Sequence, residues 1–91
     1  MPAEKLTEPQ VAEGLKTLSG WEIREGELKR LYKFSDFKEA MAFVNRVADL
    51  AEAVDHHPDI DIRYNKVQLT LSTHSAGGLT EKDFSLAKQI S

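Results

Sequence analysis

The three histidines of this chain, His56, His57 and His74, lie close together in the sequence, and the chain contains no cysteine. Imidazole is the side chain that exchanges protons most readily near neutral pH. Because packing gives no reason to gather three imidazoles, their clustering predicts proton-transfer chemistry. Two other interpretations are open: solvated surface residues that coincide by accident, or a three-histidine metal site. Against a shared metal ion, the side chains of adjacent residues in an extended chain point in opposite directions.

Carboxylates close to the histidines could orient them. Glu52 and Asp55 come just before His56, and Asp83 follows His74. A carboxylate beside an imidazole fixes its tautomer and favours its charged form, as a general acid requires. The simpler interpretation of Asp83 is a helix-capping residue. Glu52 and Asp55 also fit the polar end of a helix that has no catalytic role.

Local signals predict helices and strands in the order αββαββα. A capping box at Thr7 and Gln10 starts a first helix over 8–18, and a cap at Thr80 starts the last helix, with Asp83 three residues on. The long central helix runs from its cap Asp36, with Glu39 reaching back, to near Asp55, since Pro58 cannot lie in a helix interior. Strands are expected around 21–23, over 28–34 after the turn 25–26, and at 60–64 and 67–71.

Apolar residues at helical spacing predict which faces are buried. In the long helix the expected buried stripe is Phe37, Met41, Val44, Ala48 and Ala51, widened by Val47 and Val54. In the last helix it is Phe84, Ala87 and Ile90. We therefore expect an α+β fold with a four-stranded antiparallel sheet and the helices packed on one face.

A hairpin should bring the histidines together. A tight turn at Asn65-Lys66 places the start of the third strand beside the end of the fourth, so residues 57–60 and 71–74 become neighbours. All three histidines would then lie at one edge of the sheet. His74 shares its parity with the polar side chains of strand four, so it should point away from the core.

Length and charge exclude several classes of protein. Ninety-one residues form one domain, 1–91, and a net charge of −3 gives no basic footprint for nucleic acid. Without cysteine there is no disulfide scaffold and no thiolate metal site. The sequence from Met1 has no apolar secretory core, and its longest apolar run, 40–44, is too short to span a membrane. We expect a soluble, cytoplasmic protein that needs no metal and no cofactor.

The residues around the histidines resemble the signature of the pterin-4a-carbinolamine dehydratases. The resemblance is carried by the runs Ala51–Asp59, Tyr64–Val67, Leu71–His74 and Gly78–Asp83, with further agreement at Trp21 and over Phe37–Val47. It covers nearly the whole chain and is specific as a set. It implies an enzyme that removes water from 4a-hydroxytetrahydrobiopterin to give quinonoid dihydrobiopterin, which recycles the pterin of aromatic amino acid hydroxylases. Hydroxide is a poor leaving group, so this reaction needs a general acid and a base.

The resemblance also implies which residues act. The substrate-binding residues would be Asp55, His56, His57, Ser72, Thr73, His74 and Ser75, with Glu52, Pro58 and Asp83 in support. Our hypothesis is that His56 and His74 move the protons while His57 mainly holds the pterin. Family members form dimers or tetramers, so a homodimer or homotetramer is expected. The alternatives are a dimerisation cofactor of a transcription factor, as in vertebrate relatives, or action on another pterin such as one of molybdopterin metabolism.

Overall fold

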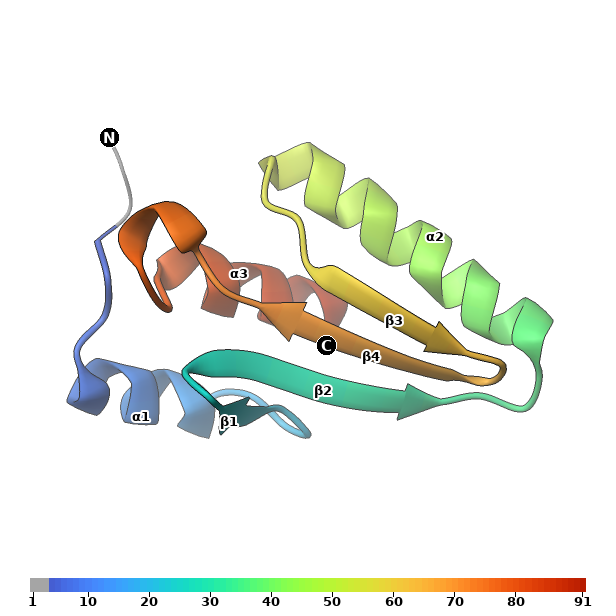
Figure 1. Ribbon diagram of the computed structural model, residues 1–91, viewed down its shortest axis with the longest axis horizontal. Helices are drawn as coiled ribbons and strands as arrows, with labels where there is room; N and C mark the ends of the chain where they lie inside the picture. The colour runs from blue at the N-terminus through green and yellow to red at the C-terminus, as the bar shows by residue number, and fades with distance from the viewer. Residues whose placement is uncertain (1–3) are drawn as a thin grey trace.

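The computed structural model describes residues 4–91 and confirms the expected order of elements. The chain forms α1 (Glu8–Lys16), β1 (Glu22–Arg24), β2 (Glu27–Lys33), α2 (Phe37–Val54), β3 (Asp59–Arg63), β4 (Lys66–Leu71), a short 3-10 turn η1 (His74–Ala76), and α3 (Glu81–Ile90) (Figure 1). The predicted α+β class with one antiparallel sheet is confirmed. Within the described residues, no helix has the length and apolar character needed to cross a membrane.

The four strands form one sheet in the order β1-β2-β4-β3, with every neighbouring pair antiparallel. The hairpin between β3 and β4 turns at Tyr64-Asn65, one residue earlier than the sequence predicted, and Lys66 is already paired in β4. Tyr64 adopts the left-handed conformation there, with φ 53°. The Asn65 side chain donates a hydrogen bond to the carbonyl of Phe34, which ties the hairpin to the end of β2. The short turn keeps the far ends of β3 and β4 side by side, as expected.

The core lies between one face of the sheet and the helices. Leu28 from β2 and Val67, Leu69 and Leu71 from β4 are fully buried on that face. In α3 the predicted stripe of Phe84, Ala87 and Ile90 is confirmed as buried. None of the helices formed by residues 4–91 covers the opposite face of the sheet, where Leu31 of β2 is 61% exposed.

The predicted buried stripe of α2 was wrong in part. The buried residues are Ala40, Phe43, Val47 and Ala51, whereas Phe37 and Val54 are 49% and 41% exposed, Ala48 is exposed, and Met41 and Val44 are half-buried. The helix carries two neighbouring apolar stripes, and periodicity alone does not say which one faces the sheet. The packing of Phe43 decides which stripe is buried. The centroid of its ring lies 4.4 Å from that of Tyr32 and 5.1 Å from that of Phe34.

The helix starts agree with the sequence signals. Thr7 and Gln10 form the predicted capping box of α1, and Asp36 accepts the backbone N–H of Glu39 at the start of α2. Glu39 reaches back to the backbone N–H of Ser35. Helix α1 ends at Lys16 rather than at residue 18, because Thr17 is its C-terminal cap and turns its hydroxyl back onto the carbonyl of Gly14.

Candidate functional site

The end of α2 places the first histidine. Asp55 adopts the left-handed conformation, with φ 52° and ψ 44°, and its N–H donates to the carbonyl of Glu52. The N–H of His56 donates to the carbonyl of Ala51. This pair of bonds is the Schellman ending of a helix, which reverses the chain direction. His56 therefore leaves the helix in a fixed direction, with its backbone held by the last turn.

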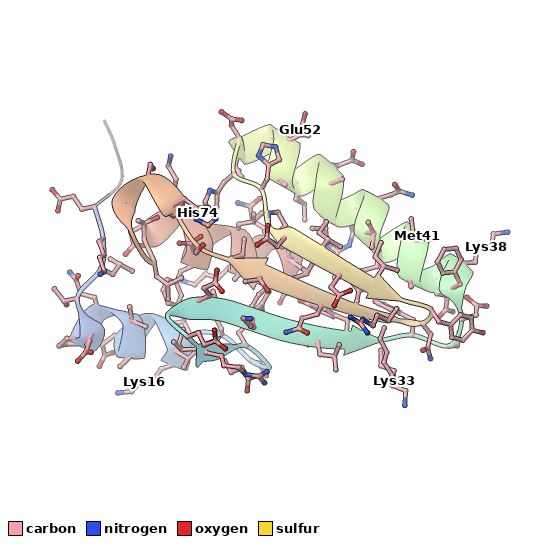
Figure 2. The ribbon with its side chains drawn as sticks, viewed as in Figure 1. Lys16, Lys33, Lys38, Met41, Glu52 and His74 are labelled. Atoms are coloured by element: carbon pink, nitrogen blue, oxygen red, sulfur yellow. The ribbon has the colours of Figure 1, made fainter. Side chains whose placement is uncertain are left out.

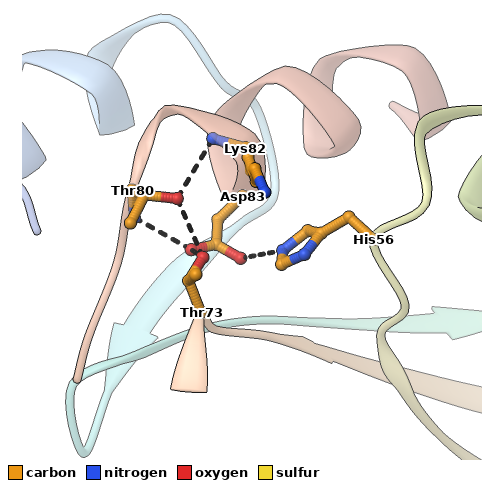
Figure 3. Close-up of polar contacts among 5 residues, drawn as sticks. All are labelled: His56, Thr73, Thr80, Lys82 and Asp83. Carbon is orange, nitrogen blue, oxygen red and sulfur yellow. Dashed lines mark hydrogen bonds and ion pairs between the residues drawn. The ribbon is translucent and has the colours of Figure 1, made fainter. Parts of the chain in front are cut away.

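His56 turns inward and meets Asp83 of α3. Nε2 of the imidazole lies 2.6 Å from Oδ1 of the carboxylate (Figure 3). The His56 side chain is 11% exposed and that of Asp83 is fully buried. A short hydrogen bond between an imidazole and a carboxylate that are both shielded from water is stronger than the same contact at the surface.

The second oxygen of Asp83 is also fully engaged. Oδ2 accepts the backbone N–H of Thr80 at 2.9 Å and the hydroxyl of Thr73 at 2.9 Å. The bond from Thr80 completes the capping box of α3, so the predicted capping role of Asp83 is confirmed. One carboxylate oxygen of Asp83 therefore caps the helix while the other contacts the imidazole of His56.

The contact with an ionised Asp83 favours one tautomer of His56. A carboxylate only accepts hydrogen bonds, so Nε2 of His56 must carry a hydrogen. In the neutral imidazole the second nitrogen, Nδ1, is then free of hydrogen and can accept a proton. Opposite an ionised Asp83, the neutral imidazole of His56 thus has Nδ1 as its hydrogen-bond acceptor.

His57 points to a different partner. Its Nε2 lies 2.5 Å from Oε2 of Glu52, in the last turn of α2, and both side chains are mostly exposed. Glu52 lies at the C-terminal end of α2 in Figure 2. The two adjacent histidines therefore have separate carboxylate partners, one buried and one at the surface.

The third histidine lies just beyond β4. His74, which is labelled in Figure 2, begins η1 and is exposed. Ser75 after it is also exposed, while Ser72 before them is half-buried. Thr73 differs from its neighbours because it is only 5% exposed and its hydroxyl turns inward to Asp83. The backbone of Thr73 pairs with Gly78, which closes the turn that carries His74.

Asp83 joins two of the three histidine segments. It contacts His56 directly and also Thr73, the residue before His74, so the break after α2 and the end of β4 lie together as the hairpin predicted. Among residues 4–91 no group of three or more histidine or carboxylate side chains is placed to hold a metal ion. A pocket of about 240 Å³ borders His56, lined by Val54, His56, Glu81, Lys82, Ser85 and Leu86. The larger pocket of about 570 Å³, beside α1 and the turn Gly77–Leu79, contains none of the histidines.

The remaining predicted residues surround this arrangement. Asp55 is exposed at the end of α2, and Pro58 is half-buried between His57 and β3. Sequence reasoning treated Thr80 only as a helix cap. Its hydroxyl in fact lies 2.8 Å from that of Thr73, a contact between residues seven apart that no local pattern signals.

Comparison with known proteins places this arrangement in a family. The sequence profile described as pterin 4 alpha carbinolamine dehydratase matches residues 4–91. The chain belongs to that family. A protein of Acidobacterium capsulatum, whose name assigns it provisionally to the pterin-4-alpha-carbinolamine dehydratases, is 56% identical over 86 residues, which cover 94% of each chain. A protein of Thermomicrobium roseum with the same name is 54% identical over 94% of this chain and 92% of its own.

Solved structures agree with the assignment to the pterin-4a-carbinolamine dehydratases. The crystal structure of a transcriptional coactivator/pterin dehydratase from Brucella melitensis matches with a TM-score of 0.92 and 39% identity, over 96% of this chain and 95% of that one. A pterin dehydratase-like protein described as a RuBisCO assembly factor in the alpha-carboxysome matches with a TM-score of 0.67 and 23% identity, over 79% and 86% of the two chains. At that identity the second likeness shows the fold alone.

Proposed function

We propose that this protein is a hydro-lyase that dehydrates 4a-hydroxytetrahydrobiopterin by histidine acid–base catalysis. The observation that carries the proposal is the shielded pair of His56 and Asp83, in a chain whose family is named for this dehydration. An imidazole held by a carboxylate in one tautomer is suited to pass a single proton in a defined direction.

The reaction needs two proton transfers and no redox step. The bond between C4a and the hydroxyl oxygen breaks, and a general acid supplies the proton with which the hydroxyl leaves as water. A base removes the proton from N5, and the electron pair of that N–H bond forms the new double bond between N5 and C4a. The products are quinonoid dihydrobiopterin and water, so the atoms balance without a cofactor.

In our assignment His56 and His74 carry these protons. Nδ1 of His56 is the exchanging nitrogen, because Nε2 is engaged by Asp83. His74 is exposed on the turn after β4, where a bound pterin could reach it. His57 holds the substrate, with Glu52 fixing its ring. Asp55, Ser72 and Ser75 complete the proposed binding surface.

A dehydratase assay on chemically generated 4a-hydroxytetrahydropterin tests the proposal. Wild type should exceed the spontaneous dehydration, and His56→Ala and His74→Ala should each lower kcat by about 100-fold or more. The matched control is His57→Gln, which should raise KM more than it lowers kcat. A wild-type rate no faster than the spontaneous one would overturn the function. A double His56→Ala/His74→Ala variant with intact turnover would overturn the assignment of roles. Running the assay with other 4a-hydroxypterins shows which pterin is preferred.

We also propose that the protein is a homodimer or homotetramer. Supporting this, Phe37 and Val54 of α2 and Ile60 and Ile62 of the edge strand β3 are each at least 36% exposed. Exposed apolar side chains and an unprotected strand edge favour association. Light scattering after gel filtration gives the mass, and Ile62→Glu should reduce it. If wild type and Ile62→Glu were both monomers, the proposal would be overturned. The exposed apolar residues would then support the second candidate function, that of an adaptor for a transcription factor.

A further inference from the structure

The hydroxyls of Thr73 and Thr80 form a chain that ends on Asp83. Oγ1 of Thr73 lies 2.9 Å from Oδ2 of Asp83 and 2.8 Å from Oγ1 of Thr80. All three side chains are buried, at 5% exposure or less. Each hydroxyl has a single hydrogen to donate, and a carboxylate has none.

With Asp83 ionised, these counts allow one arrangement of protons. Thr73 must donate its hydroxyl hydrogen to Asp83, so the hydrogen between the two threonines comes from Thr80. Thr80 in turn accepts the backbone N–H of Lys82 at 3.2 Å (Figure 3). The donations run from Lys82 N–H to Thr80, from Thr80 to Thr73, and from Thr73 to Asp83. On the other side, His56 donates to the same carboxylate.

We propose that Thr73 and Thr80 are positioning residues for the acid–base histidine. Their hydroxyls hold the Asp83 carboxylate so that Oδ1 faces His56, and thereby keep the imidazole in the tautomer that presents Nδ1 to the substrate. This inference rests on the proposed function for its kinetic consequence, but its structural part does not. It also reassigns Thr73, which the sequence placed among the substrate-binding residues.

The arrangement exceeds what helix capping requires. The capping box of α1 is exposed, and its two hydrogen bonds join only Thr7 and Gln10 to each other. The box of α3 instead uses a charged residue, buries it completely, and adds the hydroxyl of Thr73 from outside the helix. Asp83 has no lysine or arginine partner among the described residues, so its charge is compensated by neutral donors, by His56 and by the N-terminal end of α3. Removing one such donor should therefore change the tautomer preference of His56.

Ring nitrogen NMR shifts of His56, measured without substrate, test the structural part. Wild type should show hydrogen on Nε2 in the neutral form, and Thr73→Val should move the ring toward a mixture of tautomers. Thr80→Val should produce a smaller change, because that hydroxyl acts through Thr73. Thr73→Ser and Thr80→Ser keep the hydroxyls and should match wild type. Kinetics test the rest: Thr73→Val should lower kcat about tenfold with little change in KM, and Thr80→Val by less.

Thr7→Val is the matched control, because the Thr7 hydroxyl caps α1 through Gln10 and is not part of the chain that ends on Asp83. It should lower the melting temperature while leaving the His56 shifts and kcat unchanged. The inference is overturned if Thr73→Val and Thr80→Val both show the same His56 ring nitrogen shifts as wild type. It is also overturned if Thr73→Val raises KM with kcat unchanged, which would return Thr73 to substrate binding. Failure of the proposed function looks different, because wild type would then lack dehydratase activity while the NMR result stood on its own.

Discussion

His56 and Asp83 are 27 positions apart in the chain, and their side chains meet at 2.6 Å between Nε2 and Oδ1. The contact links the residue that leaves α2 with the first turn of α3. Because Asp83 is also the capping residue of α3, the same carboxylate serves the fold and the candidate site. The two roles can be separated experimentally.

Asp83→Asn tests that separation. The amide oxygen of Asn can still accept the backbone N–H of Thr80, so α3 should keep its cap, and unfolding free energy should fall by about 1–3 kcal/mol. The lost charge and the altered contact with His56 should lower kcat by about 100-fold or more. Circular dichroism melting and the dehydratase assay measure the two effects on one preparation. A variant that melts early yet keeps full kcat would assign Asp83 to the fold alone.

Glu52→Gln should separate the exposed histidine from the buried one. The Glu52 and His57 side chains are 76% and 53% exposed, so solvent screens their attraction and stability should change by no more than about 0.5 kcal/mol. If His57 holds the pterin, KM should rise while kcat remains close to wild type. Steady-state kinetics decide this, and a fall in kcat at constant KM would give His57 a proton-transfer role instead.

Asp55→Gly should stabilise the protein. Asp55 has φ 52°, a conformation that glycine adopts without steric cost, so we expect a gain of about 0.5–1 kcal/mol in unfolding free energy. Asp55→Ala keeps a Cβ at the same backbone angles and should destabilise by about 1 kcal/mol. Urea denaturation measures both variants. If glycine and alanine behaved alike, the left-handed ending of α2 would not be a source of strain.

Gly14→Ala should destabilise, against the usual trend. Replacing a helical glycine by alanine normally adds about 1 kcal/mol of stability. A Cβ at Gly14, however, would lie 2.9 Å from the ring of Phe84, which is itself 4% exposed and cannot easily move. We expect a loss of about 1–3 kcal/mol by thermal or urea unfolding. In a double-mutant cycle with Phe84→Leu, the cost of the alanine should shrink, and additive effects would contradict the close contact of α1 with α3.

Tyr32→Phe should change the alkaline stability. Burial raises the pKa of the Tyr32 hydroxyl above its ordinary value of 10.0, and the charges of Arg30 and Arg46 only partly oppose this. The folded state therefore holds the phenolic proton more tightly than the unfolded state. The resulting stability is fully present below pH 10.0 and is lost as the pH rises through the raised pKa.

The phenylalanine variant should lack that alkaline loss. At neutral pH it should be as stable as wild type or more so, since the buried Tyr32 hydroxyl has no hydrogen-bond partner among the described residues. Urea unfolding of both proteins at about pH 8 and about pH 11 gives the comparison. A difference between them that did not change with pH would show that Tyr32 ionises alike in both states.

Local signals were sufficient wherever the interaction itself was local. The capping threonines Thr7 and Thr80 satisfy backbone groups within three residues, so their sequence patterns predicted the helix starts correctly. The hairpin and its consequence, the approach of the α2 end to the β4 end, followed from strand periodicity. The turn itself lies one residue earlier than predicted, because Tyr64 takes up the left-handed conformation and Lys66 already pairs with Arg63.

Contacts between distant segments were not predictable. The packing of Phe43 on the aromatic rings of Tyr32 and Phe34 determines which face of α2 is buried. The helix sequence alone does not indicate these contacts. Likewise, Thr73 reads as a polar residue beside His74, and only the position of α3 turns its hydroxyl inward. The histidine cluster could be recognised from spacing, but which carboxylate serves which imidazole depends on how the helices pack.

The first turn of α3 ties the proposed catalysis to local opening of the protein. When this turn unwinds, the bonds of Asp83 to Thr80 and Thr73 break together, and His56 loses its partner in the same event. Only molecules with this turn closed would contain a competent site, so the active fraction equals the closed fraction. Amide hydrogen exchange at Thr80 and Asp83 would report that fraction directly. On heating, activity would decline in step with the closed fraction of this turn.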